Sequence, residues 1–265
     1  MGSVYAKYLE PALPEPRARV SGMRGDRRPK RSVLEGGLVI LYEDNDILVV
    51  DKPAGLLTIA TPTEKSQTAY FILTDYVRKG SPKSGTRVFI VHRLDRETSG
   101  VLLFAKTPEA KLKLQEAWTT TEKHYLAVVE GRPVKKADTI TSYLAEDKAH
   151  RVYSTTNSRT GRLASTAYRV LKVAKGKTLL DVHLLTGRKN QIRVHLADIG
   201  HPVVGDRKYG NAKGPHARLA LHACSISFDH PVSGQRMTLE AQPPPLFSKF
   251  LGPNRPATEP PALRR

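Results

Sequence analysis

The sequence predicts an α+β fold built around a largely antiparallel sheet. Short runs rich in β-branched and aromatic residues recur along the chain, whereas segments with helical spacing are few. Two of these runs, at 88–91 and 101–105, flank a charged loop that interrupts the apolar pattern. Strands that follow one another with few helices between them favour an antiparallel sheet over alternating strand–helix units.

Three helices are expected within this sheet-rich pattern. The first, over 66–78, carries apolar residues at helical spacing. The second begins at 107–109, because its threonine can cap free amides, its proline suits the first helical position and its glutamate suits the positive helix end. Leu114 and Trp118 are expected on its inner face. The third is expected over 190–199.

The remaining segments complete the predicted domain organisation. Further strand-like runs lie at 125–129, 151–155, 165–173, 178–185 and 218–228. Residues 1–37 are rich in Pro, Gly and Arg without apolar periodicity, which predicts a flexible basic arm. One folded domain is expected over 38–250, and residues 251–265 are expected to form a disordered, Pro-rich tail.

The charge of the chain favours an anionic partner. Lys and Arg number 43 against 25 Asp and Glu, which gives a net charge of +18. Such an excess predicts nucleic acid as the partner, with an anionic membrane surface as the weaker alternative. No apolar run approaches the length of a spanning helix and no signal-like segment begins the chain, so a cytoplasmic location is expected. The basic cluster at 24–31 either contacts phosphates or only aids solubility.

The sequence predicts neither a metal nor a cofactor. Nine histidines occur without HExxH, CxxC or zinc-ligand spacing. The fragment 176–178 resembles the end of a P-loop, but Leu171 occupies the position of the first glycine, and no GxGxxG is present. Cys224 stands alone, which predicts a buried small hydrophobe and excludes a disulfide within one chain.

The charged loop at 92–100, HRLDRETSG, is the strongest functional signal. It is longer than a tight hairpin turn, and it sets Asp95 among arginines between two buried strands. A rigid sheet is therefore expected to present Asp95 to a ligand. The alternative is a solvated hairpin loop in which Asp95 caps a turn.

The sequence of this loop, followed by VLLFAKT, resembles the signature of the RluA-type pseudouridine synthases, whose catalytic aspartate corresponds to Asp95. Four further segments resemble the family in the same order. They are LYEDNDILVVDKPAGL at 41–56, KHYLAVVEG at 123–131, LLTGRKNQIRVHLADIGHPVVGDRKYG at 184–210 and RLALHACSISFDHP at 218–231. The arm is too short and irregular for the small S4-type RNA-binding domain that many relatives carry.

The resemblance implies a pseudouridine synthase fold with a catalytic cleft along the sheet. It also implies isomerisation of uridines in structured RNA, where the bond from N1 to C1′ is broken and C5 is joined to C1′. Ribosomal and transfer RNA both remain open as substrates. A monomer is expected, and the reaction requires no cofactor.

Asp95, Tyr125 and Arg193 are the predicted catalytic residues. Arginines beside Asp95 would keep it ionised, and it could attack C1′, stabilise an oxocarbenium-like centre or remove a ribose proton. The resemblance pairs Arg193 with Asp95, and its planar guanidinium is expected to orient both carboxylate oxygens. In isolation Arg193 would be a solvated helix residue, away from the buried stripe of Ile192, Leu196 and Ile199. The resemblance sets Tyr125 against the target base, with a core position as the alternative.

The predicted RNA-binding residues surround this centre. The resemblance implies that Arg93 fills the gap left by an extruded uridine. Arg96 and Arg188 are expected to contact RNA. Lys52 is expected to act as scaffold, with a phosphate contact as the alternative. Where the family often has Arg-Thr-His-Gln, this chain has RKNQ at 188–191. The hydrogen bond or RNA contact of the usual histidine is therefore not expected here, whereas the roles of the carboxylate, tyrosine and arginine are unaffected.

Two other function classes remain open on the sequence. A catalytically silent RNA-binding protein could use the same cleft, although it would not need Asp95, Tyr125 and Arg193 together. A nucleoside hydrolase or glycosidase could use Asp95 at C1′. Such enzymes commonly pair two carboxylates, and nothing in the loop fixes Glu97 opposite Asp95.

Overall fold

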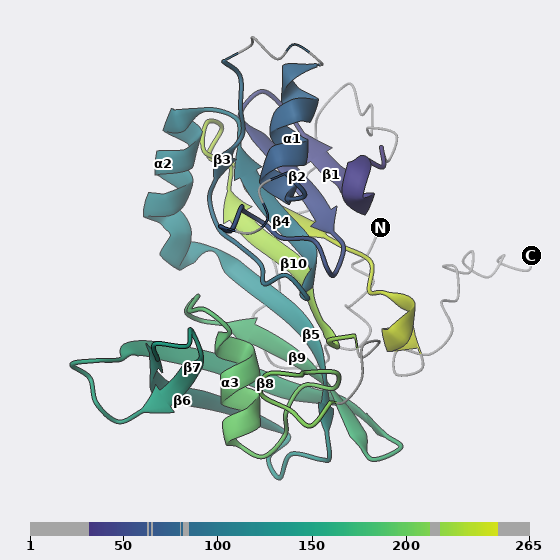
Figure 1. The fold of residues 1–265 in the computed structure, drawn as a ribbon, viewed down its shortest axis with the longest axis vertical. Helices are drawn as coiled ribbons and strands as arrows, with labels where there is room; N and C mark the ends of the chain where they lie inside the picture. The colour runs from purple at the N-terminus through teal and green to yellow at the C-terminus, as the bar shows by residue number, and fades with distance from the viewer. Residues whose placement is uncertain are drawn as a thin grey trace, which may run out of the picture.

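Apolar strands near the start of the domain explain why helices cover both faces of the sheet. The computed structural model describes residues 32–62, 64, 66–79, 81, 85–212 and 218–248. Within these residues, β2 (Ile47–Lys52) pairs antiparallel with β4 (Ser99–Ala105). Because side chains alternate along a strand, one face packs on α1 (Ala69–Arg78) and the other on α2 (Pro108–Glu116). Figure 1 shows these two helices beside β2, β4 and β3 (Phe89–Ile90).

Eleven strands of the described residues form one mixed sheet. Its pairs are antiparallel except for β10 (Leu221–Asp229) with β4, which are parallel. The observed architecture is therefore α+β with a largely antiparallel sheet, as predicted. The order is β1 (Val39–Glu43), β2, β4, β10, β5 (Glu122–Glu130), β9 (Lys177–Leu184), β8 (Arg162–Ala174), β6 (Ala137–Glu146) and β7 (Val152–Thr155), with β11 (Arg236–Glu240) on β10 and β3 on β4.

The parallel contact of β4 with β10 depends on a glycine at the end of the charged loop. Gly100 has φ of +118°, and a Cβ placed on it would lie 2.1 Å from the carbonyl oxygen of Ala223. No L-residue with a side chain fits there without moving one of the strands. Gly100 therefore brings the end of the loop that carries Asp95 against the centre of the sheet.

The third helix, α3 (Gln191–Asp198), packs on β6, β7 and β8 (Figure 1). The Gln191 side chain donates to the Ser165 carbonyl and to Thr166 Oγ1, and the buried His195 contacts Thr166 Oγ1. The predicted span of 190–199 is confirmed within two residues at the start and end. Ile199, however, is 36% exposed, so it lies at the end of the buried stripe rather than in it.

Several predicted boundaries shift for local reasons. α1 begins at Ala69, three residues later than predicted, because Thr68 Oγ1 caps the amide of Phe71. α2 begins as predicted, with Thr107 Oγ1 capping Ala110. The strands β6 and β11 were not predicted. Short 3₁₀ turns lie at Glu35–Gly37, Ala117–Thr120 and Pro245–Phe247.

The folded domain begins before residue 38. Ser32 accepts a hydrogen bond from the amide of Ile40 through its carbonyl, and Val33 bridges to Val39. The rest of the predicted arm, 1–31, and the predicted tail at 251–265 lie outside the described residues. None of the helices in the described part is long and apolar enough to cross a membrane.

Candidate active site

The loop that carries Asp95 is fixed by hydrogen bonds to the segment after β2. Thr58 Oγ1 donates to the Leu94 carbonyl at 2.8 Å, and the amide of Gly55 donates to the Arg96 carbonyl at 2.8 Å. Arg96 Nε donates back to the Gly55 carbonyl at 3.0 Å. These bonds hold the backbone on either side of Asp95, so the carboxylate is presented by a rigid loop.

Lys52, at the end of β2, holds the same loop through hydrogen bonds to backbone carbonyls. Its side chain is fully buried, and Nζ donates to the carbonyls of Pro53 at 2.9 Å, Leu56 at 2.8 Å and Arg96 at 3.2 Å. Burial lowers the pKa of Lys52 to about 7. Because an ammonium group has three protons and all three have carbonyl acceptors, none is left for a phosphate. The geometry supports the scaffold interpretation of Lys52 over the alternative of a phosphate contact.

The three predicted catalytic residues line one pocket. Asp95, Tyr125 and Arg193 come from the loop, from β5 and from α3, and Arg93 and Arg188 also line this pocket. Lys52 and Arg96 are not among its lining residues. The side chains of Arg93, Arg96 and Arg188 belong to exposed residues. The fold therefore unites residues that are 30 to 98 positions apart in the sequence.

Arg193 contacts two carboxylates, and the closer one was not predicted. Its NH1 lies 3.4 Å from Oδ2 of Asp95. Its Nε and NH2 donate to the two oxygens of Asp206 at 2.7 and 2.8 Å. The predicted ion pair with Asp95 is present, but the expectation that the guanidinium orients both oxygens of Asp95 is wrong. The planar fork of Arg193 is matched to Asp206 instead.

Asp206 is built to hold this arginine. Its side chain is fully buried, and Oδ1 also accepts the amides of Lys208 and Tyr209 at 2.8 and 3.0 Å. Burial alone would raise the pKa of Asp206, but the hydrogen bonds and charge of Arg193 hold it below its ordinary value. Burial alone would lower the pKa of Arg193, but the hydrogen bonds and charge of Asp206, followed by those of Asp95, raise it above its ordinary value. Sequence reasoning missed Asp206, although it is one of two carboxylates in the 184–210 segment.

Asn190 and Tyr209 complete the surroundings of Arg193. Asn190 Oδ1 accepts from Arg193 NH1 at 3.3 Å, and Asn190 Nδ2 donates to the Tyr209 hydroxyl at 3.0 Å. The Tyr209 ring centroid lies 5.2 Å from the Arg193 guanidinium carbon. Asn190 adopts φ of +53°, a left-handed conformation that asparagine tolerates better than most residues. The departure at this position therefore supplies hydrogen bonds to the site.

Tyr125 is a buried residue with an unused hydroxyl. It is 7% exposed and belongs to the main core cluster. No hydrogen bond to its hydroxyl occurs among the residues that the structure describes. Burial and, to a smaller extent, the charge of Asp95 raise its pKa, so the hydroxyl keeps its proton at neutral pH. Tyr125 therefore packs in the core, lines the pocket and carries a hydroxyl that forms no hydrogen bond among the described residues.

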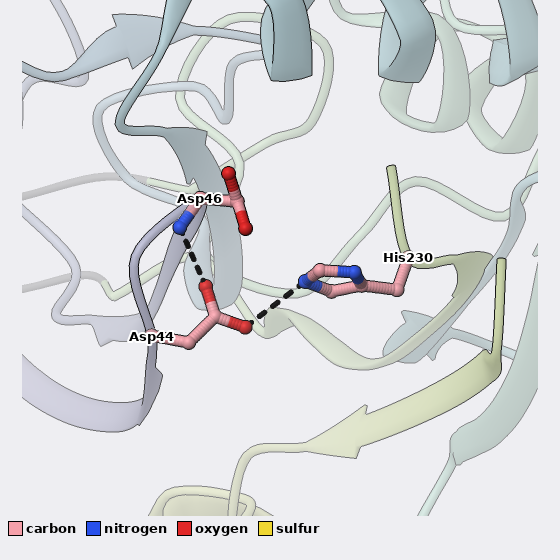
Figure 2. Close-up of side chains that lie close together, drawn as sticks. All are labelled: Asp44, Asp46 and His230. Atoms are coloured by element: carbon pink, nitrogen blue, oxygen red, sulfur yellow. Dashed lines mark hydrogen bonds and ion pairs between the residues drawn. The ribbon is translucent and has the colours of Figure 1, made fainter. Parts of the chain in front are cut away.

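A second polar group, formed by Asp44, Asp46 and His230, has donor atoms close enough to suggest a cation site (Figure 2). Asp44 Oδ1 accepts the amides of Asp46 and Ile47, and Oδ2 accepts from the Tyr42 hydroxyl and from His230 Nε2. His230 Nδ1 accepts the amides of Val232 and Ser233. Since protein donors already occupy Asp44 and His230, the group ties the β1–β2 turn to the end of β10.

Comparisons with known proteins agree on one family. Residues 46–198 match the family model described as RNA pseudouridylate synthase. An uncharacterized RNA pseudouridine synthase, YhcT, of Bacillus subtilis is 38% identical over 78% of this chain and 68% of its own length. Ribosomal large subunit pseudouridine synthase D of Nitrosomonas europaea is 37% identical over 78% of this chain, which spans 62% of that protein.

Solved structures give the same result for the fold. Human RNA Pseudouridylate Synthase Domain Containing 1 superposes with a TM-score of 0.62 at 26% identity, covering 82% of this chain and 87% of that one. Human RNA Pseudouridylate Synthase Domain Containing 4 gives a TM-score of 0.66 at 24% identity, covering 80% and 91%. The second likeness shows a common fold alone.

Proposed function

The chain belongs to the RNA pseudouridylate synthase family, and from this premise we propose that Asp95 is the carboxylate that acts on C1′ of the target uridine. The chain is an RNA uridine isomerase, which breaks the bond between N1 and C1′ and joins C5 to C1′. Tyr125 and Arg193 are proposed to complete the catalytic centre around Asp95. The observation that carries this assignment is the meeting of these three side chains in one pocket.

The contacts of Asp95 suit a carboxylate that acts on a ligand. Oδ2 lies 3.4 Å from Arg193, whereas Oδ1 accepts no hydrogen bond within the described residues. The carboxylate oxygen that accepts no bond can approach C1′, whether it attacks the carbon, stabilises positive charge there or removes a ribose proton.

Tyr125 is proposed to lie against the extruded base. A uridine must leave its stack before C1′ and C5 can be reached, and the pocket beside Asp95 is proposed to receive it. The ring of Tyr125 provides an apolar surface for the base, and its protonated hydroxyl is available for proton transfer near C5. Arg93, Arg96 and Arg188 are exposed and are proposed to contact the surrounding RNA.

Large-subunit ribosomal RNA is the proposed substrate. Relatives from Nitrosomonas europaea and Rickettsia bellii, at 37% and 35% identity, are named ribosomal large subunit pseudouridine synthases. The net charge of +18 favours binding to a long polyanion. Ribosome assembly in the cytoplasm is the proposed setting. Action on transfer RNA and a monomeric state stay predictions of the sequence.

The test is the variant Asp95→Asn, which keeps the size of the side chain and removes its charge. RNA labelled with tritium at uridine C5 releases the label when C5 bonds to C1′, so release measures turnover. We expect turnover to fall by about 10²- to 10⁴-fold, the range for losing a group that acts on the reacting atoms. Glu97→Gln is the matched control, because Glu97 is an exposed carboxylate of the same loop.

Three outcomes would contradict the proposal. Turnover of Asp95→Asn near the wild-type rate would refute the role of this carboxylate. Release of free uracil by the wild-type protein would indicate glycoside hydrolysis. RNA binding without tritium release from any RNA tested would indicate a silent binding protein.

A further inference from the structure

Three cationic side chains from separate segments converge beside the catalytic pocket. Lys208 Nζ lies 2.8 Å from the carbonyl oxygen of His150, and Lys189 Nζ lies 3.5 Å from the same oxygen. The two ammonium nitrogens are therefore no more than about 6 Å apart. The Arg151 guanidinium carbon and Lys208 Nζ lie 5.2 and 5.7 Å from the ring centroid of Tyr209. We refer to Arg151, Lys189 and Lys208 as the cation cluster.

The turn between β6 and β7 is shaped to bring these cations together. His150 adopts φ of +58°, a conformation that is uncommon for residues with a side chain. Its amide donates to the Asp147 carbonyl, and the Arg151 amide donates to Asp147 Oδ1. This turn directs the His150 carbonyl toward both lysines. The convergence therefore follows from backbone geometry as well as from side-chain placement.

The charge of the cation cluster is not balanced within the described residues. Glu146 contacts Lys189, but Arg151 and Lys208 form no ion pair with a carboxylate in this part of the chain. Partial burial lowers the pKa of Lys208, and the positive charges of Lys189, Arg193 and Arg151 lower it further, against a smaller opposite effect of Glu146. Like charges held this close repel one another, so a bound anion would stabilise the arrangement.

The position of the cation cluster identifies the anion. Lys189 lines the pocket that also contains Asp95 and Arg193, and the ring of Tyr209 lies 5.2 Å from Arg193, as close as it lies to Arg151. When a nucleotide has its ribose at Asp95, its flanking phosphates must lie at the rim of the pocket. We propose that the cation cluster binds a backbone phosphate of the RNA next to the target uridine, an inference that rests on the proposed function.

This assignment gives a role to the sequence departure at 188–191. The charge of Lys189 joins the cation cluster, because its Nζ contacts the His150 carbonyl and Glu146 and forms no ion pair with Asp95 within the described residues. Phosphate contacts fix the register of a protein on nucleic acid without selecting a sequence. The cation cluster therefore positions the RNA, while the pocket carries out the reaction.

The test measures binding of an unmodified large-subunit ribosomal RNA transcript over a series of KCl concentrations. The double variant Lys189→Gln/Lys208→Gln should reduce the slope of log affinity against log salt by about 0.7 to 0.9 per lost contact. At about 0.1 M salt the same change weakens binding roughly 5- to 8-fold per contact.

Three single variants distinguish a phosphate site from a general loss of positive charge. Lys113→Gln removes an exposed lysine from α2 and should leave the salt slope unchanged. Lys208→Arg should keep the slope, and Arg151→Gln should lower it independently of the lysines. If the double variant and Arg151→Gln both keep the wild-type slope, the cation cluster is not a phosphate site. Failure of the proposed function would appear instead as absent tritium release by the wild-type protein, whatever the slope.

Discussion

Removing the charge of Asp206 should disable the enzyme without touching the substrate. In Asp206→Asn, Arg193 loses the two short charge-assisted bonds at 2.7 and 2.8 Å, which leaves Asp95, 3.4 Å away in the wild-type structure, as its ion-pair partner among the described residues. The freed guanidinium would then be drawn toward Asp95, the nearest remaining carboxylate. Both oxygens of Asp95 would become engaged, so the carboxylate would lose the oxygen that is proposed to approach C1′.

The size of the effect follows from the burial of the pair. The Asp206 side chain is fully buried and that of Arg193 is 11% exposed. Breaking a buried ion pair by changing one partner costs about 3 to 5 kcal/mol, and asparagine retains one oxygen acceptor, so we expect a loss near the lower value, about 3 kcal/mol. A displacement of catalytic groups by about 1 Å can cost roughly 10²-fold in rate, which is the expected fall in kcat.

The assay is tritium release at saturating RNA, combined with urea unfolding, at a temperature well below the melting transition. A positioning role predicts a lower kcat with little change in KM. Partial unfolding would instead lower the apparent kcat only in proportion to the folded fraction, which urea unfolding measures. Asp138→Asn is the matched control, because Asp138 forms an exposed pair with Lys135, and its loss should change stability much less than the loss of the buried pair. Wild-type kcat and stability in Asp206→Asn would refute the reasoning.

Further predictions concern the pocket, the response to pH and the backbone. Tyr125→Phe should keep the stability of the protein and, if the hydroxyl transfers a proton, lower kcat about 10²-fold or more. A kcat unchanged in the tritium-release assay would show that the ring acts only by stacking on the base. Burial lowers the pKa of His222 from 6.5 to about 4. As the pH falls below about 6.5, His222 is therefore protonated in the unfolded chain but not in the folded protein, and the free energy of unfolding decreases. Urea unfolding should show about 2 kcal/mol of this loss by about pH 5, and His222→Gln should lack it. Gly205→Ala should lower the melting temperature far more than Gly85→Ala, because a Cβ at Gly205 would lie 2.0 Å from the Arg218 carbonyl oxygen; equal effects would contradict this.

The sequence predicted those parts of the fold where local pattern and burial agree. β2 and β4 are apolar on both faces because helices cover both, so they resemble short buried runs. α2 was located from its capping residues, and α3 from its apolar spacing. β6 escaped prediction because one face is largely exposed along much of its length, and its alternation of exposed and partly buried residues runs through threonine and serine.

The sequence named three residues that lie in one pocket and one contact among them, that of Asp95 with Arg193, but not the pairing of Arg193 with Asp206. The loop around Asp95 has a distinctive sequence, so the position of the carboxylate could be inferred before the structure was known. The partner of Arg193 depends on how the segment after α3 folds back, and no local pattern in the sequence specifies that path. Lys52 was ambiguous for the same reason, since a lysine that binds three carbonyls has the same sequence context as one that binds phosphate.

The two carboxylates around Arg193 have different chemical requirements, which explains the unequal distances. A carboxylate that anchors an arginine is most effective when both oxygens are engaged, and Asp206 meets this condition with four donors. A carboxylate that acts on C1′ must keep an oxygen accessible, and the single long contact to Arg193 leaves one oxygen of Asp95 without a hydrogen bond among the described residues.

The geometry at Asp95 is therefore set by two elements that are anchored separately. Lys52 and Thr58 fix the loop that carries Asp95, whereas Gln191 and Asp206 fix α3 and its arginine. Because each anchor is made largely of buried hydrogen bonds, neither element must move when the other contacts RNA. Substitutions at these anchors should consequently alter the reaction rate even though the anchoring side chains remain out of contact with the substrate.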